Sequence, residues 1–280
     1  MFFGSDNQGP VPEAVLEALR VANQGYAASY GADAITLDVV SRIQTLFEAP
    51  DAAVYLAATG TAANTLALAC ICPPWATIYC SPVAHIQEDE CNAPEFFTGG
   101  AKLNLVGSDD KLTPAALEQA ILGTAQGDVH GPQRGPVSLT QITEKGRIYT
   151  LSELSELCAV AKAYDLPVHM DGARFANAIA ALGCSAAEMT WRCGIDALTF
   201  GGTKNGLMGV EAVIFFDPVT VGERIELDKH DDDYLVRVII RKARMANRNR
   251  CAQRSAHFGL GCGCAGWRRF CRAARAASMV

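Results

Sequence analysis

Two short apolar runs, each followed by polar residues, most constrain the fold of this chain. The first, Leu166–Met170, ends at Asp171 and precedes Arg174 and a helical pattern. The second, Ile195–Phe200, leads into Lys204, which lies between glycines. Short apolar runs of this kind are typical of buried strands that deliver side chains to one edge of a sheet. We therefore expect Asp171, Arg174 and Lys204 to meet at that edge.

Strand-like and helix-like segments alternate along the chain. Strands are expected at 52–57, 77–80, 102–106, 137–140, 166–170, 195–200 and 212–216, and helices near 12–25, 35–48, 64–70, 113–122 and 150–164. The last helix opens on Thr150-x-x-Glu153, a capping box. Alternation at this spacing predicts an α/β fold with a mainly parallel sheet and right-handed crossovers.

Composition places the chain among globular proteins. It has 280 residues, of which 50% are hydrophobic and 19% charged, enough for one large domain with or without a smaller one. No apolar run approaches the roughly 20 residues that span a bilayer, and the N-terminus does not have the pattern of a signal peptide. The 11 cysteines are odd in number and irregularly spaced, which favours free thiols. We expect a cytoplasmic protein with no membrane partner.

Charge is distributed unevenly. The chain carries 30 acidic and 24 basic residues, and 11 of the basic ones lie from Tyr234 onward, where there is no acid. Residues 1–233 therefore hold 13 basic and 30 acidic groups. The tail has the charge of a nucleic-acid-binding segment but neither a recognisable module nor interleaved aromatic residues, so no nucleic acid is expected. Cys262 and Cys264 are too close for a zinc site, and no metal is expected.

Four weak signals point to a bound phosphate-bearing ring. Thr59-Gly60-Thr61 stands at a strand-to-helix turn, where backbone N–H groups and a hydroxyl favour a phosphate, although such turns are often only structural. His85 follows a strand and is either a loop histidine or an imidazole stacked on a flat ligand. Asp171 is either a helix N-cap, a salt-bridge partner of Arg174 or a ligand-binding carboxylate.

Lys204 is the fourth signal. Most lysines are solvated, but this one ends an apolar strand between glycines, where desolvation would lower its pKa and supply an amine nucleophile. Pyridoxal phosphate needs a phosphate cup, a stacking partner, a carboxylate on its pyridine nitrogen and a Schiff-base lysine. In chain order the sequence offers these as Thr59-Gly60-Thr61, His85, Asp171 and Lys204, and pyridoxal 5'-phosphate is the predicted cofactor.

The sequence resembles the low-specificity L-threonine aldolases, including their phenylserine aldolase-like members, which are fold-type I pyridoxal-phosphate enzymes. The resemblance covers about residues 1–217 and rests on SDN (5–7), SYGAD (29–33), ATGTAAN (58–64), AHIQEDECNAPEFFTGGAKL (84–103), VSLTQ (137–141), LPVHMDGARFANA (166–178) and FGGTKNG (200–206). It implies a fold-type I transferase-like large domain.

The resemblance also implies a role for each matched site residue. Lys204 would bind the cofactor, Asp171 would pair with its pyridine nitrogen, and His85 would stack on its ring. The phosphate would be bound by Gly60 and Thr61. The substrate carboxylate would be received by Arg174 and Ser5.

The sequence departs from the family in two places. Some members carry a histidine in the loop after the strand at 137–140, where this chain reads Thr140-Gln141-Ile142-Thr143, so that histidine's role is not transferred. Members also continue into a small C-terminal domain with another carboxylate-binding arginine. Here the resemblance fades after about Pro218. We assign 1–233 to the large domain with its N-terminal arm, and interpret 234–280 as a truncated or scrambled, frameshifted remnant of the small domain.

The implied reaction is retro-aldol cleavage of L-threonine, L-allo-threonine or a related β-hydroxy-α-amino acid to glycine and an aldehyde. His85, or a water that it positions, is the expected base, with Glu88 as a second candidate. The alternatives are a β-eliminating amino-acid lyase of the same fold, or a protein impaired by its altered C-terminus. The family also implies a homotetramer or dimer. Tyr30 is predicted either near an intersubunit site or as a buried structural residue.

Overall fold

The computed structural model describes residues 4–217, which all fall within the unit Met1–Tyr234. The predicted boundary at 233/234 and the basic tail lie outside these residues. A seven-stranded sheet occupies the centre of the described part, in the order β1-β7-β6-β5-β4-β2-β3. Its strands are β1 (Ala53–Ala57), β2 (Thr77–Cys80), β3 (Lys102–Leu105), β4 (Val137–Thr140), β5 (Val168–Gly172), β6 (Ala197–Gly201) and β7 (Glu211–Phe215).

The sheet is mainly parallel, as predicted. Within residues 4–217, β7 alone runs against the other strands, and it pairs antiparallel with both β1 and β6. The remaining pairings, β2 with β3 and β4, β4 with β5, and β5 with β6, are parallel. The carboxyl ends of the parallel strands therefore open on one edge of the sheet, where ligands bind in folds of this kind.

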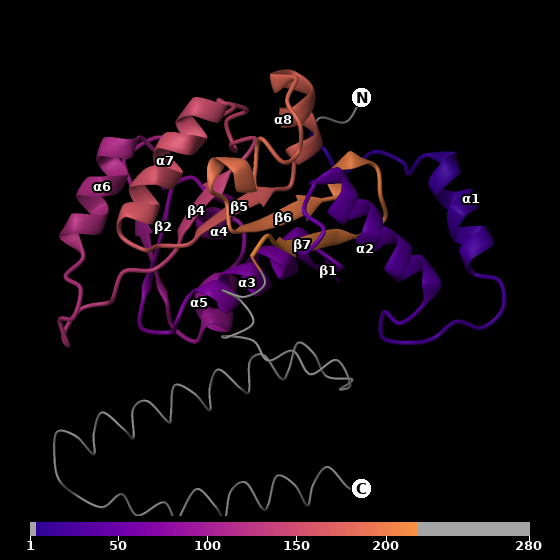
Figure 1. Ribbon diagram of the computed structural model, residues 1–280, viewed down its shortest axis with the longest axis horizontal. Coiled ribbons are helices and arrows are strands. Elements are labelled where there is room, and N and C mark those ends of the chain that lie inside the picture. The colour runs from indigo at the N-terminus through magenta and orange to yellow at the C-terminus, as the bar shows by residue number, and fades with distance from the viewer. Residues whose placement is uncertain (1–3, 218–280) are drawn as a thin grey trace, which may run out of the picture. The chain divides into compact units, whose positions relative to one another are not determined.

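Helices cover both faces of the sheet (Figure 1). On one face lie α6 (Pro114–Gly123), α7 (Leu151–Ala163) and α8 (Phe175–Leu182), and on the other lie α3 (Gly60–Ile71) and α5 (Ala93–Thr98). The helix α3 packs against β1, β5, β6 and β7. The remaining helices are α1 (Glu13–Ala22), α2 (Ala34–Leu46), α4 (His85–Glu88) and two 3-10 turns, η1 (Trp191–Cys193) and η2 (Thr203–Asn205).

Alternation along β5 shows how the sheet divides core from site. Val168 and Met170 are fully buried in the main hydrophobic cluster, with Leu154 of α7 among its members. Each such side chain contributes about 1.5–3 kcal/mol through burial. Because successive side chains in a strand point to opposite faces, His169 and Asp171 face the side covered by α3. The core-forming pattern of β5 thus aims its carboxylate at the α3 side of the sheet.

Two helix starts show how the sequence sets local structure. The predicted capping box of α7 is confirmed: Thr150 accepts from the Glu153 backbone, and the Glu153 side chain accepts from the Thr150 backbone. Thr59 caps α3 by accepting from the backbone N–H of Ala62 at 3.1 Å. Caps of this kind stabilise a helix by about 1 kcal/mol. As a result α3 begins at Gly60, earlier than the sequence pattern indicated.

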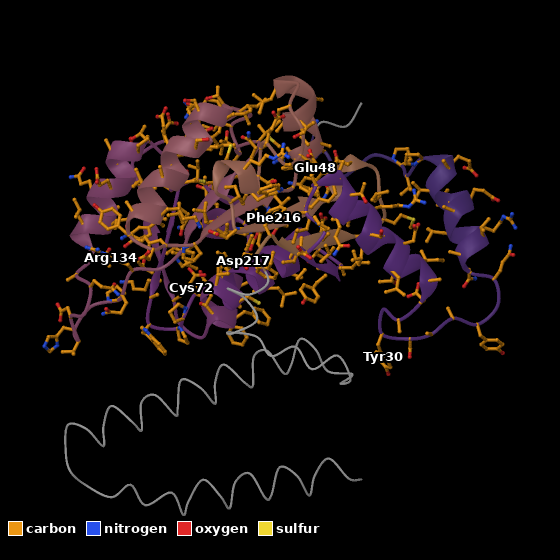
Figure 2. All side chains as sticks on the ribbon, viewed as in Figure 1. Tyr30, Glu48, Cys72, Arg134, Phe216 and Asp217 are labelled. Atoms are coloured by element: carbon orange, nitrogen blue, oxygen red, sulfur yellow. The ribbon has the colours of Figure 1, made fainter. Side chains whose placement is uncertain are left out.

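Within residues 4–217 the helix α1 is largely exposed, whereas α2 packs its Ile43 against the main hydrophobic cluster. The expected apolar face of α1 exists, but Leu16 and Leu19 are 42% and 49% exposed, and neither α1 nor α2 contains a buried residue. Tyr30 is 77% exposed on the loop between them (Figure 2), so its reading as a buried structural residue is wrong. In the part of the chain that the structure describes, no helix has the length and apolar character of a membrane span.

Candidate active site

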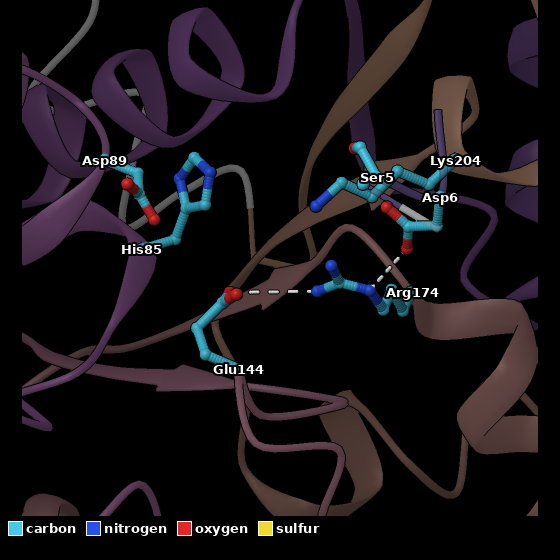
Figure 3. A pocket seen from close by; sticks show the side chains of 8 residues that line it. Ser5, Asp6, His85, Asp89, Glu144, Arg174 and Lys204 are labelled. Carbon is cyan, nitrogen blue, oxygen red and sulfur yellow. Dashed lines mark hydrogen bonds and ion pairs between the residues drawn. The ribbon is translucent and has the colours of Figure 1, made fainter. Parts of the chain in front are cut away.

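A cavity of about 590 Å³ opens at the predicted sheet edge. It brings together residues from the N-terminal arm, from α4 and from the loops after β4, β5 and β6 (Figure 3). The lining residues are Gly4, Ser5, Asp6, His85, Asp89, Glu144, Arg174 and Lys204. Four residues predicted from the sequence, namely Ser5, His85, Arg174 and Lys204, therefore share one cavity.

Lys204 lies half-buried on η2, one short turn after β6. Glycines bring this turn close to its neighbours: a Cβ on Gly201 would stand 2.4 Å from the Ala173 carbonyl oxygen, and one on Gly202 would stand 2.4 Å from that of Val210. Neither position has room for a side chain. The Lys204 side chain extends into the cavity toward His85 (Figure 3).

Arg174 pairs with two acids of the cavity and not with Asp171. Its Nε donates to Asp6 at 2.6 Å, and its Nη1 lies 3.8 Å from a Glu144 oxygen. Partial burial opposes ionisation of Asp6, but the hydrogen bond and charge of Arg174, with the charge of Lys204, lower its pKa. The Asp171–Arg174 salt bridge considered from the sequence is absent from the ion pairs of residues 4–217. A substrate carboxylate would therefore compete with Asp6 and Glu144 for this guanidinium.

Asp171 lies behind the cavity, only 2% exposed. Its Oδ1 accepts from the backbone N–H of Ala173 at 3.0 Å, and its Oδ2 accepts from Asn64 Nδ2 at 2.9 Å. The same Asn64 nitrogen donates to Glu90 Oε1 at 2.9 Å, and that oxygen lies 2.9 Å from His85 Nδ1. A continuous buried chain, His85–Glu90–Asn64–Asp171, thus links the cavity wall to the carboxylate behind it.

The two titratable groups at the open end of this chain are perturbed in the same direction. The hydrogen bond to Glu90 raises the pKa of His85 above its ordinary value, with the nearby charge of Asp171 adding to the effect. Burial raises the pKa of Glu90, against the hydrogen bonds from His85 and Asn64 that lower it. Perturbed pairs in a cavity are typical of functional sites. His85 is therefore kept protonated to higher pH than a free imidazole.

The predicted phosphate site lies at the first turn of α3 but does not line the cavity. Gly60 and Thr61 are the first residues of this 12-residue helix, whose leading N–H groups have no intrahelical acceptor. A Cβ on Gly60 would meet no atom within 4 Å, so the space above this turn is open. Asn64 lies one turn further along the same helix. The helix therefore presents an anion-binding end and a buried amide to the same region.

Several functional residues were missed from the sequence. The sequence predicts no role for Glu90, Asp89 or Glu144, and Asn64 stands only as the last residue of the ATGTAAN motif (58–64). Of the acids at 88–90, the predicted candidate base Glu88 is exposed and does not line the cavity. The available signal for Glu90 was its position five residues after His85.

The departure at Gln141 has a structural explanation. Its buried side chain donates to the Tyr149 carbonyl and accepts from the Tyr149 N–H, both at 2.9 Å, so it braces the loop after β4. That loop reaches the cavity through Glu144 instead.

The residues present fit pyridoxal phosphate. Lys204 offers an amine in the cavity, His85 a flat ring on its wall, Asp171 a buried carboxylate and α3 an anion-binding terminus. Among the described residues, the buried polar atoms Asn64 Oδ1, Glu90 Oε2 and Thr203 Oγ1 have no hydrogen-bond partner, and Thr203 directly precedes Lys204 in the chain. His85, Glu90 and Asp171 each also offer one nitrogen or oxygen atom, and these three atoms lie within 4.8 Å of one another, a spacing that would suit a bound cation.

Comparison with known proteins supports this interpretation. The chain is 44% identical over 216 residues to the low specificity L-threonine aldolase of Pseudomonas sp. (strain NCIMB 10558), an alignment that covers 77% of this chain and 62% of that protein. It is 45% identical, with the same coverage, to the low specificity L-threonine aldolase of Pseudomonas aeruginosa. The chain thus spans about three fifths of the length of these relatives.

A solved structure and a sequence family give the same result. The threonine aldolase of Leishmania major superposes with a TM-score of 0.73 at 26% identity, covering 85% of this chain and 66% of that one. Residues 3–254 match the family described as Beta-eliminating lyase, a match that runs past the start of the basic tail. The chain therefore belongs to the beta-eliminating lyase family.

Proposed function

We propose that this protein binds pyridoxal 5'-phosphate and cleaves L-threonine, L-allo-threonine or a related β-hydroxy-α-amino acid to glycine and an aldehyde. The observation that carries the proposal is the shared cavity of Lys204 and His85, joined through buried hydrogen bonds to Asp171. The similarity to L-threonine aldolases of Pseudomonas supports this substrate class.

Each residue would have a separate task. The bound cofactor would supply an electron sink for the carbanion left when the Cα–Cβ bond breaks. Lys204 would hold it covalently, Asp171 would keep a proton on its pyridine nitrogen, and the first turn of α3 (Gly60 and Thr61) would bind its phosphate.

Two further tasks concern the substrate. Arg174, with the hydroxyl of Ser5, would bind the substrate carboxylate in place of Asp6 and Glu144. His85 would take the proton of the β-hydroxyl, directly or through a water, because its Nδ1 is held by Glu90 and its Nε2 is left for exchange. Glu88 is no longer a good candidate base, since it lies outside the cavity.

The test is a Lys204→Ala variant compared with Lys102→Ala, which changes an exposed lysine on β3. We expect Lys204→Ala to lose both the visible absorbance of lysine-bound cofactor and all threonine cleavage, with an unchanged circular dichroism spectrum. The control should keep all three properties. Turnover by Lys204→Ala would contradict the assignment.

The second candidate is β-elimination from an amino acid with a leaving group on Cβ, which the description of the matched family favours. The two reactions are separated by their products: glycine and an aldehyde in one, pyruvate and ammonia in the other. A protein that binds the cofactor but forms neither pair would be the impaired form.

We also propose a homo-oligomer, a tetramer or dimer, in the cytoplasm. Exposed apolar residues on α1 and α2 support an intersubunit role for this arm; they include Leu16, Leu19, Val21, Ile35, Leu37 and Leu46. Analytical ultracentrifugation of the wild type and of a Leu16→Ser, Leu19→Ser double variant tests this proposal. The variant should dissociate into smaller species at protein concentrations at which the wild type stays associated. The free thiols of Cys80, Cys91, Cys158, Cys184 and Cys193 support a reducing compartment.

A further inference from the structure

We propose that Glu90 is a positioning residue whose buried carboxylate fixes the imidazole of His85 and ties it, through Asn64, to Asp171. The meaning of His85 in the reaction rests on the proposed function, but the contacts of Glu90 do not. Glu90 belongs to an acidic run of three residues whose other members are exposed. Its side chain is fully buried.

The burial of Glu90 is explained by its contacts. One oxygen, Oε1, lies 2.9 Å from both His85 Nδ1 and Asn64 Nδ2. An uncompensated carboxylate in such a place would cost several kcal/mol, so a buried acid is retained only where partners satisfy it. The other oxygen, Oε2, is buried without a partner in the described residues. The buried position of Glu90 is therefore explained by its contacts with His85 and Asn64.

The contact determines which nitrogen of His85 carries a proton. A carboxylate oxygen only accepts, so Nδ1 must be the donor. In the neutral ring the other nitrogen, Nε2, then has its lone pair free. Glu90 thus selects the tautomer that a general base in the cavity needs, and restrains rotation of the ring about its χ2 angle.

Asn64 extends the effect to Asp171. The two hydrogens on its Nδ2 are directed at Glu90 and Asp171, each at 2.9 Å. The opposite amide orientation would place an oxygen against two carboxylates, so electrostatics fixes this one. Asn64 thus bridges Glu90 and Asp171, two buried acids that each have an oxygen within 4.8 Å of the other's and of a ring nitrogen of His85.

The charges that face His85 come from several segments. Glu90, Asp171 and Glu144 favour its protonated form, with the hydrogen bond to Glu90 as the largest cause of the raised pKa. Asp89 and Lys204 also line the cavity. Because Glu90 contributes most, removing its charge should move the imidazole pKa more than any other single change.

The experiment measures the imidazole pKa of His85 in the cofactor-free protein by NMR, with EDTA present to exclude bound cations. The sequence has five histidines, so the His85 signal is assigned from its loss in a His85→Asn variant. Glu90→Gln keeps the shape but removes the charge. Glu88→Gln makes the same change on an exposed neighbour. Glu90→Asp keeps the charge on a shorter side chain.

We expect Glu90→Gln to lower the pKa of His85 by about 1 pH unit, Glu90→Asp to lower it less, and Glu88→Gln to leave it unchanged. Equal titration of His85 in the wild type and in Glu90→Gln would overturn the proposal. If Glu90→Gln does not fold, Glu90→Asp decides: a wild-type pKa in that variant overturns it, and a lowered one supports it.

A second readout separates this inference from the proposed function. If His85 is the base, the acid limb of the kcat/KM profile for threonine cleavage should move to lower pH in Glu90→Gln, by the same amount as the NMR pKa. A shift seen by NMR without a shift of the limb would support Glu90 as a positioning residue and contradict His85 as the base.

Discussion

Replacing Asn64 by leucine tests the buried chain most directly. Leucine has a similar volume but no donor, so both Glu90 and Asp171 lose the hydrogen bond that Asn64 supplies. Hydrogen bonds to charged groups contribute about 1.5–3 kcal/mol each, and Glu90 can relieve part of the loss by taking up a proton. We expect Asn64→Leu to lower the free energy of unfolding by about 3 kcal/mol at pH 7.

The pH dependence of this loss has a definite sign. Burial already raises the pKa of Glu90, and the hydrogen bond from Asn64 opposes that rise. Without Asn64 the folded-state pKa of Glu90 rises further above its unfolded value. An acid of this kind destabilises the fold at high pH and does so less as pH falls through its folded pKa. The penalty of Asn64→Leu should therefore be smaller at pH 5 than at pH 7.

Urea unfolding of the cofactor-free protein at both pH values measures the effect. The matched control is Asn177→Leu, which makes the same change at an exposed position of α8 and should stay within about 0.5 kcal/mol of the wild type. A loss below about 1 kcal/mol at pH 7, or one of equal size at pH 5, would refute the view that Asn64 stabilises two buried charges.

Three further outcomes follow from single contacts. Burial lowers the pKa of His169 from 6.5 to about 4. The free energy of unfolding should therefore fall by up to about 3 kcal/mol as pH drops through this range. In urea unfolding, His169→Gln should show a much smaller dependence of this free energy on pH. Gly201→Ala places a Cβ 2.4 Å from the Ala173 carbonyl oxygen. This clash should lower the free energy of unfolding, measured by thermal denaturation, by about 2 kcal/mol and should weaken cofactor binding. The control Gly123→Ala adds a Cβ with no atom within 4 Å and should change neither property. Thr150→Ala removes a capping box and should cost about 1 kcal/mol in urea unfolding; an unchanged midpoint would contradict the role of the cap.

The strands and most of the helices were predictable because their signals are local. The strand at 137–140 was predicted with the bounds that the structure gives, and the capping box of α7 followed from two residues three positions apart. Local rules fail where neighbours in space decide. The apolar face of α1 was predicted from its pattern, but the pattern does not say what covers it, and no described part of this chain does.

The site was only partly predictable, for a related reason. Lys204 and Arg174 were found because strands of a parallel sheet deliver their ends to one edge, so a polar residue after an apolar run has a predictable destination. Pairings between such residues have no local signal. A salt bridge between Arg174 and Asp171 was one alternative that their spacing left open, yet the hydrogen-bond partner of Arg174 is Asp6, which lies 168 positions away in the sequence.

The sequence by itself determined the alternation of strands and helices, and hence the edge at which a lysine, an aspartate and an arginine collect. Hydrophobic periodicity and the residues at the ends of a segment are local properties, and they do not depend on how the rest of the chain packs. Tertiary structure alone decided that Asn64 reaches Asp171 across 107 positions and that Glu90, not Glu88, meets His85. Those choices depend on how α3 and α4 pack on the sheet, because only packing determines which polar groups are removed from water and must satisfy one another.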